Sequence, residues 1–269
     1  MSYTKILKAV SNEEQLRAFY RTLYAAWGCQ HWWPARTRFE VIVGAYLTQN
    51  TSWKNVEMAL RRVRVAGVLS LKGIRAVPLA ELEVLIRSAG YFRQKAARLK
   101  TFVTFVDQNY GGSLNRMFAQ PTSKLRQELL ALNGVGPETA DSILLYAGQH
   151  PVFVVDAYTR RILDRHGILS ANAPYEEIRQ LFERALSSPI TWGQPPSAVQ
   201  AERSSAASAR SATGCQNPAH LPSSMSLAKR SPLVQAYNDM HGLIVGIGKH
   251  YCLTSKPHCE QCPLRMFLP

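Results

Sequence analysis

Apolar residues recur at helical spacing along much of the chain, separated by short polar or glycine-containing breaks. In residues 12–27, Leu16 and Leu23 fall on one side, and Asn12 with Gln15 three residues later forms a candidate capping pair. The same pattern predicts further helices at residues 39–47, 53–68, 78–89, 90–109, 122–132, 158–165, 175–185 and 233–247, and one that begins at Pro137. We therefore expect a chain built largely from amphipathic helices.

One break differs from the others because it places two glycines between two predicted helices. The segment Asn133-Gly134-Val135-Gly136 interrupts the periodicity, and glycine reaches backbone angles that strain other residues. Pro137 follows at the first helical position, where its missing N–H costs least. Such a hairpin turns free backbone N–H groups at a helix N-terminus towards solvent, which predicts an anion site.

A single carboxylate follows the hairpin at the end of an apolar run. Asp156 comes directly after residues 152–155, Val-Phe-Val-Val, and directly before a predicted helix start at Ala157. For an isolated aspartate in this position, the simpler interpretation is an ordinary helix N-cap. The alternative is that Asp156 performs chemistry.

Composition narrows the class of protein. The chain has 269 residues, of which 46% are hydrophobic, and its formal net charge is +14. A basic surplus of this size suits a polyanionic partner, either nucleic acid or an anionic membrane surface. No apolar run is long enough to span a bilayer, and the N-terminal residues contain no signal-peptide pattern. We therefore expect a cytoplasmic protein.

Residues 187–229 differ in composition from the rest. They are rich in Ser, Ala and Pro and contain few large apolar side chains, so they are not expected to fold by themselves. We predict a flexible surface insertion there, in which Cys215 has no structural role.

Two adjacent tryptophans, Trp32 and Trp33, precede Pro34 in an otherwise loop-like stretch. They can pack between structural units, since Trp buries a large apolar surface, or they can form a stacking platform for an extruded base. The polar stretch at residues 48–52 also has two interpretations. It is either an ordinary capped turn or a segment that contacts a partner.

Together, the hairpin and Asp156, which lies eighteen residues after Glu138, resemble the helix-hairpin-helix DNA glycosylases of the endonuclease III superfamily. The resemblance covers roughly residues 12–185 and 232–263. It implies an all-α fold with a six-helix domain at 39–148 and a second domain built from 1–38 and 149–269. It also implies a monomer that binds double-stranded DNA containing a damaged base.

The resemblance assigns roles to individual residues. In that family the hairpin, here Asn133, Gly134, Val135 and Gly136, grips a DNA phosphate, and an aspartate at the place of Asp156 serves the catalytic step. The segment LTQNTSWKNVEMAL resembles the one in which a glutamine, here Gln49, fills the space left by the extruded base. The stretch containing Arg93, Lys95, Arg98 and Lys100 also matches, so these cations either face DNA or form a solvated helix face.

The C-terminal cysteines, Cys252, Cys259 and Cys262, resemble the iron–sulfur loop of the same superfamily, where four thiolates hold a [4Fe–4S] cluster. The fourth position is occupied here by Leu268. The fourth ligand would come from Cys29, Cys215, His258 or solvent, or the cluster is incomplete or absent. A zinc site of three cysteines and His258 is chemically possible, although His258 adjoins Cys259.

The branch of the family is indicated by two features. Bifunctional members carry a lysine nucleophile where this chain has Glu138, and a carboxylate cannot form a Schiff base. The HWWP segment resembles the 3-methyladenine DNA glycosylases of endonuclease III type, in which aromatic residues, here Trp32, Trp33 and Phe39, line the base pocket. An alkylated purine is cationic, and aromatic faces favour a cation.

The resemblance thus implies a monofunctional glycosylase of base excision repair that removes an alkylated purine. One alternative is a bifunctional glycosylase and lyase that acts on oxidised pyrimidines or abasic sites through another lysine. A second is a non-catalytic DNA-binding helix-hairpin-helix protein, which would need neither Asp156 nor Gln49.

Overall fold

The computed structural model describes residues 11–187 and 221–269. Over these residues the chain is helical and contains no β-strand. The α-helices are α1 (Asn12–Trp27), α2 (Arg38–Thr48), α3 (Trp53–Val65), α4 (Leu71–Ala76), α5 (Leu79–Leu85), α6 (Phe92–Tyr110), α7 (Leu114–Phe118), α8 (Thr122–Leu130), α9 (Pro137–Ser142), α10 (Ala157–Arg165), α11 (Tyr175–Ser187) and α12 (Pro232–His250). Shorter elements are the 3₁₀ turns η1 (Arg87–Ala89), η3 (Cys259–Gln261) and η4 (Arg265–Phe267), and the π-helical η2 (Ile143–Gly148), which continues α9.

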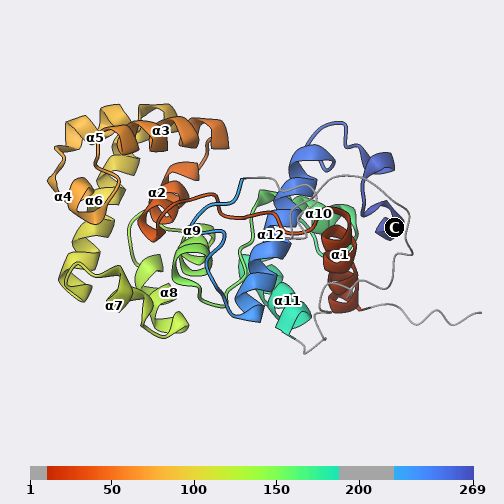
Figure 1. Ribbon diagram of the computed structural model, residues 1–269. Helices are drawn as coiled ribbons and strands as arrows, with labels where there is room; N and C mark the ends of the chain where they lie inside the picture. Colours follow the sequence, from red (N-terminus) through yellow and green to blue (C-terminus); the bar gives the residue numbers. More distant parts are fainter. Residues whose placement is uncertain (1–10, 188–220) are drawn as a thin grey trace, which may run out of the picture.

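The helices form two groups that lie side by side (Figure 1). The first contains α2 to α9, in which α2 packs against α3, α6 and η2. The second brings α1 from the start of the chain onto α11 and α12 from its end, with α10 packed on α12, and α12 also contacts η2. The domain boundaries stay a prediction, although the two groups follow the expected order of segments.

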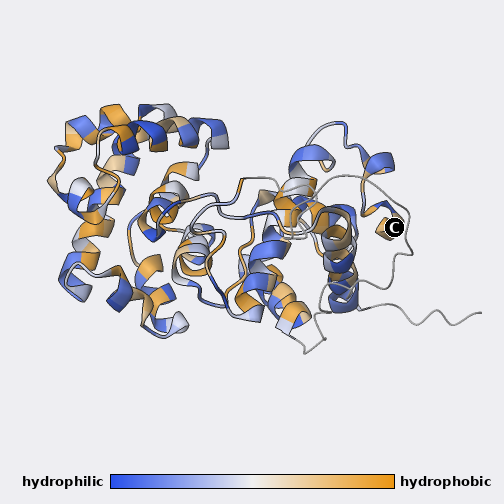
Figure 2. Ribbon diagram, in the orientation of Figure 1, coloured by the Kyte–Doolittle hydropathy of each residue, from blue (hydrophilic) through white to orange (hydrophobic). Residues whose placement is uncertain are grey.

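Burial explains why these helices form. Most carry both hydrophilic and hydrophobic residues, as Figure 2 shows. In α1 the buried side chains are Leu16, Phe19 and Leu23, which confirms the predicted face. By contrast, α12 is buried over nearly its whole middle, including the polar residues Asn238, Asp239 and His241. None of the described helices has both the length and the apolar character to cross a lipid bilayer.

One helix cap and two short helices differ from the sequence predictions for local reasons. Ser11 rather than Asn12 caps α1, because its side chain pairs with Glu14 in a reciprocal capping box. The sequence pattern does not predict the short helices α4 and α7, since each has one buried residue and too little periodicity. Their N-caps, Ser70 and Ser113, are the available sequence indication.

The predicted insertion also needs correction at its C-terminal end. Residues 188–220 lie outside the described part of the chain, but 221–229 is described and packs on the tryptophan segment. Met225 is buried, and its N–H donates to the carbonyl of Ala35 at 3.1 Å. Ser223 donates to the carbonyl of Trp33 at 3.5 Å. This part contains few large apolar residues, yet one methionine and its backbone bonds anchor it.

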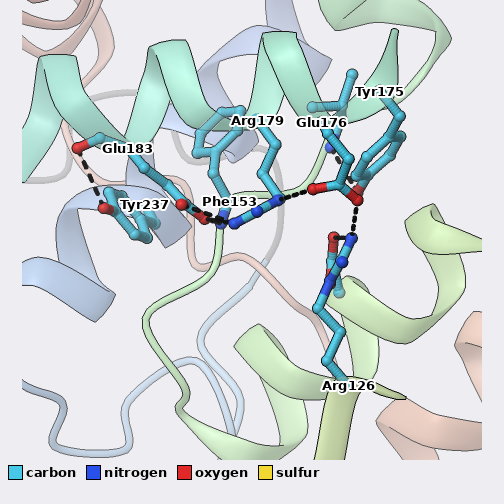
Figure 3. Close-up of polar contacts among 9 residues, drawn as sticks. Arg126, Phe153, Tyr175, Glu176, Arg179, Glu183 and Tyr237 are labelled. Carbon is cyan, nitrogen blue, oxygen red and sulfur yellow. Dashed lines mark hydrogen bonds and ion pairs between the residues drawn. The ribbon is translucent and has the colours of Figure 1, made fainter. Parts of the chain in front are cut away.

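A partly buried ionic network lies along the extended run that leads to Asp156 and holds it (Figure 3). Arg126 of α8 pairs with Asp141 of α9 at 2.7 Å and with Glu176 of α11 at 2.6 Å. Along α11, Arg179 bridges Glu176 and Glu183. The Phe153 N–H donates to Glu183 at 3.0 Å, and the Val155 N–H donates to the Tyr175 hydroxyl at 3.3 Å. Side chains thus satisfy backbone groups that have no strand partner.

Candidate active site

The hairpin between α8 and α9 has the geometry expected of a glycine turn. Gly134 has a φ of 77°, and a Cβ there would lie 1.9 Å from Nε of Arg98. Gly136 is the exposed N-cap of α9 and has no side-chain cap bond, and a Cβ added to it would meet no atom within 4 Å. Pro137 occupies the first turn, as predicted. The N–H groups at the start of α9 therefore face outwards.

Gln49 lies against this hairpin, at the C-cap of α2. Its amide nitrogen donates to the Gly134 carbonyl and to the Thr139 hydroxyl, both at 2.9 Å. Its amide oxygen accepts from Arg98 at 3.0 Å. In the protein alone, Gln49 therefore ties the end of α2 to the hairpin, and entry into a DNA stack would require these bonds to be exchanged.

Asp156 is the N-cap of α10 and also borders a large cavity. Its Oδ1 accepts from the N–H of Thr159 at 2.7 Å and from the Thr159 hydroxyl at 2.9 Å. The side chain retains 13% exposure. The N-cap interpretation is therefore confirmed, because Oδ1 caps the helix. Oδ2 remains for other contacts, and the chemical role of Asp156 stays a prediction.

The cavity has a volume of about 970 Å³ and lies between the two groups of helices. It brings Asp156, the tryptophan pair, Gln49 and Gly136 together. Trp53 extends the aromatic wall, since its ring lies 5.2 Å from that of Trp33. The other lining residues include Glu138, Thr139, Tyr158, Arg160, Tyr175, His241 and Lys249.

The structure contradicts the predicted roles of Phe39 in the base pocket and of Lys95 in DNA binding. Phe39 is buried in the core of α2 and does not border this cavity, because it lies on the opposite side of the helix from the tryptophan contacts. Lys95 is 1% exposed, and its ammonium group donates to the carbonyls of Leu47 at 2.9 Å and Ala89 at 2.7 Å. It therefore stabilises the ends of α2 and η1, where the helix dipole favours a cation, and does not face DNA.

Glu138 borders the cavity near Asp156. The residue as a whole is exposed, but it lies in the concave lining of the cavity. Partial desolvation of the carboxyl there, together with the charge of Asp156, raises the pKa of Glu138 to about 7. A carboxyl group with a pKa near neutral therefore stands at the position where the resemblance places a lysine in bifunctional enzymes.

The sequence interpretation misses two residues beside the cavity. His241 of α12 and Tyr146 of η2 are buried, and the Tyr146 hydroxyl lies 2.6 Å from Nδ1 of His241. Nε2 of His241 lies 3.6 Å from Oδ2 of Asp156. The available indication is the group of polar residues Asn238, Asp239 and His241 within the mostly apolar middle of this helix.

This arrangement matches known proteins over most of the chain. A family model for the HhH-GPD superfamily of base excision DNA repair proteins matches residues 43–188. A candidate DNA repair glycosylase of Methanocaldococcus jannaschii is 38% identical over 94% of this chain and 96% of its own length. The chain belongs to the HhH-GPD superfamily.

Solved structures agree with this assignment. The 3-methyladenine DNA glycosylase of H. pylori, bound to 1,N6-ethenoadenine, has a TM-score of 0.66 and 26% identity, covering 89% of this chain and 97% of that one. A trapped covalent endonuclease III–DNA intermediate has a TM-score of 0.66 at 21% identity, covering 95% of both chains, and shares the fold. This HhH-GPD protein is therefore an all-α DNA glycosylase, which confirms the predicted fold class, family and enzyme class.

The cysteine loop of this HhH-GPD protein does not fit the expected cluster. Cys252, Cys259 and Cys262 border one small cavity together with Leu268 and Arg165, whose guanidinium lies 3.1 Å from the Cys252 sulfur. That cavity has a volume of about 20 Å³, room for about one water molecule. Over the described residues, no three cysteine, histidine or acidic side chains converge as a metal-binding group. The three thiols thus border one cavity without forming a metal-binding group among the described residues, and Leu268 lies beside them.

Proposed function

We propose that this chain is a monofunctional DNA glycosylase that hydrolyses the N-glycosidic bond of an alkylated purine, such as 3-methyladenine, extruded from double-stranded DNA. The observation that carries the proposal is one cavity bordered by a carboxylate, Asp156, and a tryptophan wall, Trp32 and Trp33. A cationic purine suits this wall, because aromatic faces attract cations and the base needs little protonation to leave. The similarity to a 3-methyladenine glycosylase supports the same substrate class.

The chemistry follows from these groups. A water oxygen forms a bond to C1′ of the sugar while the bond from C1′ to the base nitrogen breaks, and the bonding electron pair leaves with the base. The alkylated base departs neutral, and the proton lost by water passes to the Asp156 carboxylate and then to solvent. Before that, the Asp156 charge stabilises the oxocarbenium-like sugar.

The DNA would lie across the cavity mouth. Backbone N–H groups of the hairpin at Gly134 and Gly136 would hold a phosphate, and the basic surplus of the chain would strengthen the attraction. Gln49 would exchange its bonds to Gly134 and Thr139 for the bases beside the extruded nucleotide.

Base release from alkylated duplex DNA tests the proposal. We expect free methylpurine from the wild type, with strand breaks only after alkali, and a roughly 10²- to 10⁴-fold slower release from Asp156→Asn. Asp164→Asn, on the exposed part of the same helix, is the matched control and should keep full activity. Equal release by Asp156→Asn and the wild type would contradict the proposed mechanism.

A lyase activity is the second candidate, and Lys249 is the observation that favours it. This lysine borders the same cavity and lies over the Trp32 ring, 5.8 Å from its centroid. Partial burial lowers the pKa of Lys249, which increases the share of nucleophilic amine. Borohydride trapping on abasic DNA distinguishes the two: a covalent complex formed by the wild type and by Lys256→Met, but not by Lys249→Met, would establish the lyase.

A further inference from the structure

A buried chain of contacts leads from the aromatic wall to Asp156. Tyr146 and His241 are 1% and 4% exposed. Their rings pack beneath the tryptophans: the centroid of Tyr146 lies 5.2 Å from that of Trp33, and the centroid of His241 lies 6.1 Å from that of Trp32. The side chains that would stack on the base therefore rest directly on this pair.

The neighbours of His241 favour one position for the imidazole proton. Burial raises the pKa of Tyr146 well above its ordinary value, so its hydroxyl stays protonated and is available to donate to Nδ1 of His241, which lies 2.6 Å away. In the opposite arrangement, with Nδ1–H donating to the hydroxyl, the Nε2 lone pair would face the Asp156 carboxylate at 3.6 Å, which is repulsive. Burial also lowers the pKa of His241, with Asp156 opposing, so its imidazole is neutral. A neutral imidazole that accepts at Nδ1 carries its single proton on Nε2.

That proton is directed at the functional carboxylate. Nε2 of His241 is buried and makes no hydrogen bond with any residue in 11–187 or 221–269. Oδ2 of Asp156 is an acceptor 3.6 Å away. Oδ1 of the same carboxylate is already held by the backbone and side chain of Thr159. A small rotation of the carboxylate would complete the bond, as catalytic hydrogen bonds often tighten when substrate binds.

We infer that His241 is a positioning residue for Asp156: held as the Nε2–H tautomer by Tyr146, it directs a hydrogen bond at Oδ2 and keeps the carboxylate aligned and charged. This inference rests on the proposed catalytic role of Asp156. An unpaired buried N–H is costly, and its satisfaction by a carboxylate favours the charged form. His241 would thus couple the aromatic wall to the oxygen that acts on water or the sugar.

Other groups face Asp156 and bear on its pH dependence. They come from each neighbouring element: Glu138 of α9, Tyr146 of η2, Tyr158 of α10, and His241 and Lys249 of α12. All of Glu138, Lys249 and His241 border the cavity, but Glu138 and Lys249 are exposed whereas His241 is buried. Substitution of His241 therefore changes a contact that neither of these exposed groups can replace.

The first experiment measures single-turnover base release from alkylated duplex DNA across pH. His241→Leu removes the donor at similar volume, and we expect release to fall roughly 10- to 100-fold, with the acid limb of the profile displaced to higher pH. His241→Gln, whose amide can donate in place of Nε2, should restore most of the rate and return the acid limb of the profile toward its wild-type pH. Affinity for a duplex with a non-cleavable abasic analogue should not change, and thermal melts identify any loss of folded protein.

The second experiment reads the tautomer without a substrate. ¹⁵N spectra of the histidine side chains, with His241→Gln for assignment, should show a neutral, Nε2-protonated His241 in the wild type and a mixture of tautomers in Tyr146→Phe. A cationic or Nδ1-protonated His241, or an unmoved acid limb in folded His241→Leu, would overturn the inference. No methylpurine release by the wild type would contradict the proposed substrate instead, and the tautomer measurement would still decide the inference.

Discussion

Single residues in this protein take their roles from their surroundings rather than from their type. Glu138 and Asp156 are two carboxylates at one cavity, yet Asp156 is held through Oδ1 by Thr159, whereas no described side chain donates to Glu138. Environments that separate two titratable groups in this way commonly mark distinct functions. The difference is measurable on the protein alone.

Replacement of Glu138 by Gln should change stability in a pH-dependent way. The folded-state pKa of Glu138 is raised from 4.5 to about 7 by burial and by Asp156. The stability that Glu138 contributes is therefore fully present below the unfolded pKa and is lost as pH rises through about 7. Glu138→Gln has no carboxyl group to ionise and does not lose this stability. The melting temperature of the variant minus that of the wild type should therefore increase between about pH 5 and pH 8.

Thermal melts at several pH values check this expectation. Glu177→Gln, at an exposed position of α11, serves as the control and should show a constant difference from the wild type. A constant difference for Glu138→Gln as well would show that its carboxyl titrates as an ordinary surface group.

Lys95 gives a second prediction at the same scale. Lys95→Met leaves the carbonyls of Leu47 and Ala89 without their donor in a buried site, which should cost about 2 to 4 kcal/mol of unfolding free energy. Because the ammonium group does not face DNA, the salt dependence of DNA binding should stay the same. Urea unfolding and salt titrations measure the two effects, with the exposed Lys72→Met as the control for stability. A reduced salt slope for Lys95→Met would instead support a DNA-facing role.

At the scale of helices, the ionic network around Arg126 joins α8, α9 and α11 beneath the run that ends at Asp156. Asp141 is 0% exposed, and Arg126 opposes the rise in its pKa that burial causes. A buried charge that loses its partner is far more costly than the loss of the pair. The network therefore predicts a marked asymmetry between single and double substitutions.

Arg126→Met should destabilise the protein by roughly 3 to 5 kcal/mol, whereas Arg126→Met combined with Asp141→Leu should recover most of that loss. Urea unfolding of the two variants and of Asp141→Leu alone gives the coupling free energy. Additive effects would mean that Asp141 is not dependent on Arg126. Loss of activity in the folded double variant would show that the network also holds the Asp156 run in place.

How far the sequence predicts these elements depends on the range of the interactions. The bounds of α1 are predicted correctly because its apolar face repeats locally, and Asp156 is recognisable as an N-cap because the helix starts directly after it. The role of Lys95 is predicted wrongly because nothing nearby in sequence indicates that two helix ends converge on it. The contact of Tyr146 with His241 joins residues 95 positions apart, and periodicity carries no information about such pairs.

At the scale of the whole molecule, a net charge of +14 and an open hairpin both bear on affinity for DNA. The charge acts over the entire surface and is weakened by salt, whereas the proposed hairpin contact involves one phosphate. Substitution at Gly136 distinguishes the contribution of the hairpin from that of the overall charge, because a side chain at this position would meet no neighbouring atom within 4 Å. Gly134 is unsuitable for this purpose, since its φ of 77° and its contact with Arg98 would strain any replacement.

Gly136→Asp should weaken duplex binding roughly tenfold by placing a negative charge beside the held phosphate, and should lower the salt slope by about one contact. Gly136→Ala adds a methyl group into open space and should bind as the wild type does. Fluorescence anisotropy at several salt concentrations measures both quantities. If the alanine and aspartate variants bind alike, the hairpin does not hold phosphate, and the charge of the surface alone accounts for the affinity. If only the aspartate variant weakens, the phosphate contact places the cavity over one nucleotide, and the general charge serves to bring DNA to it.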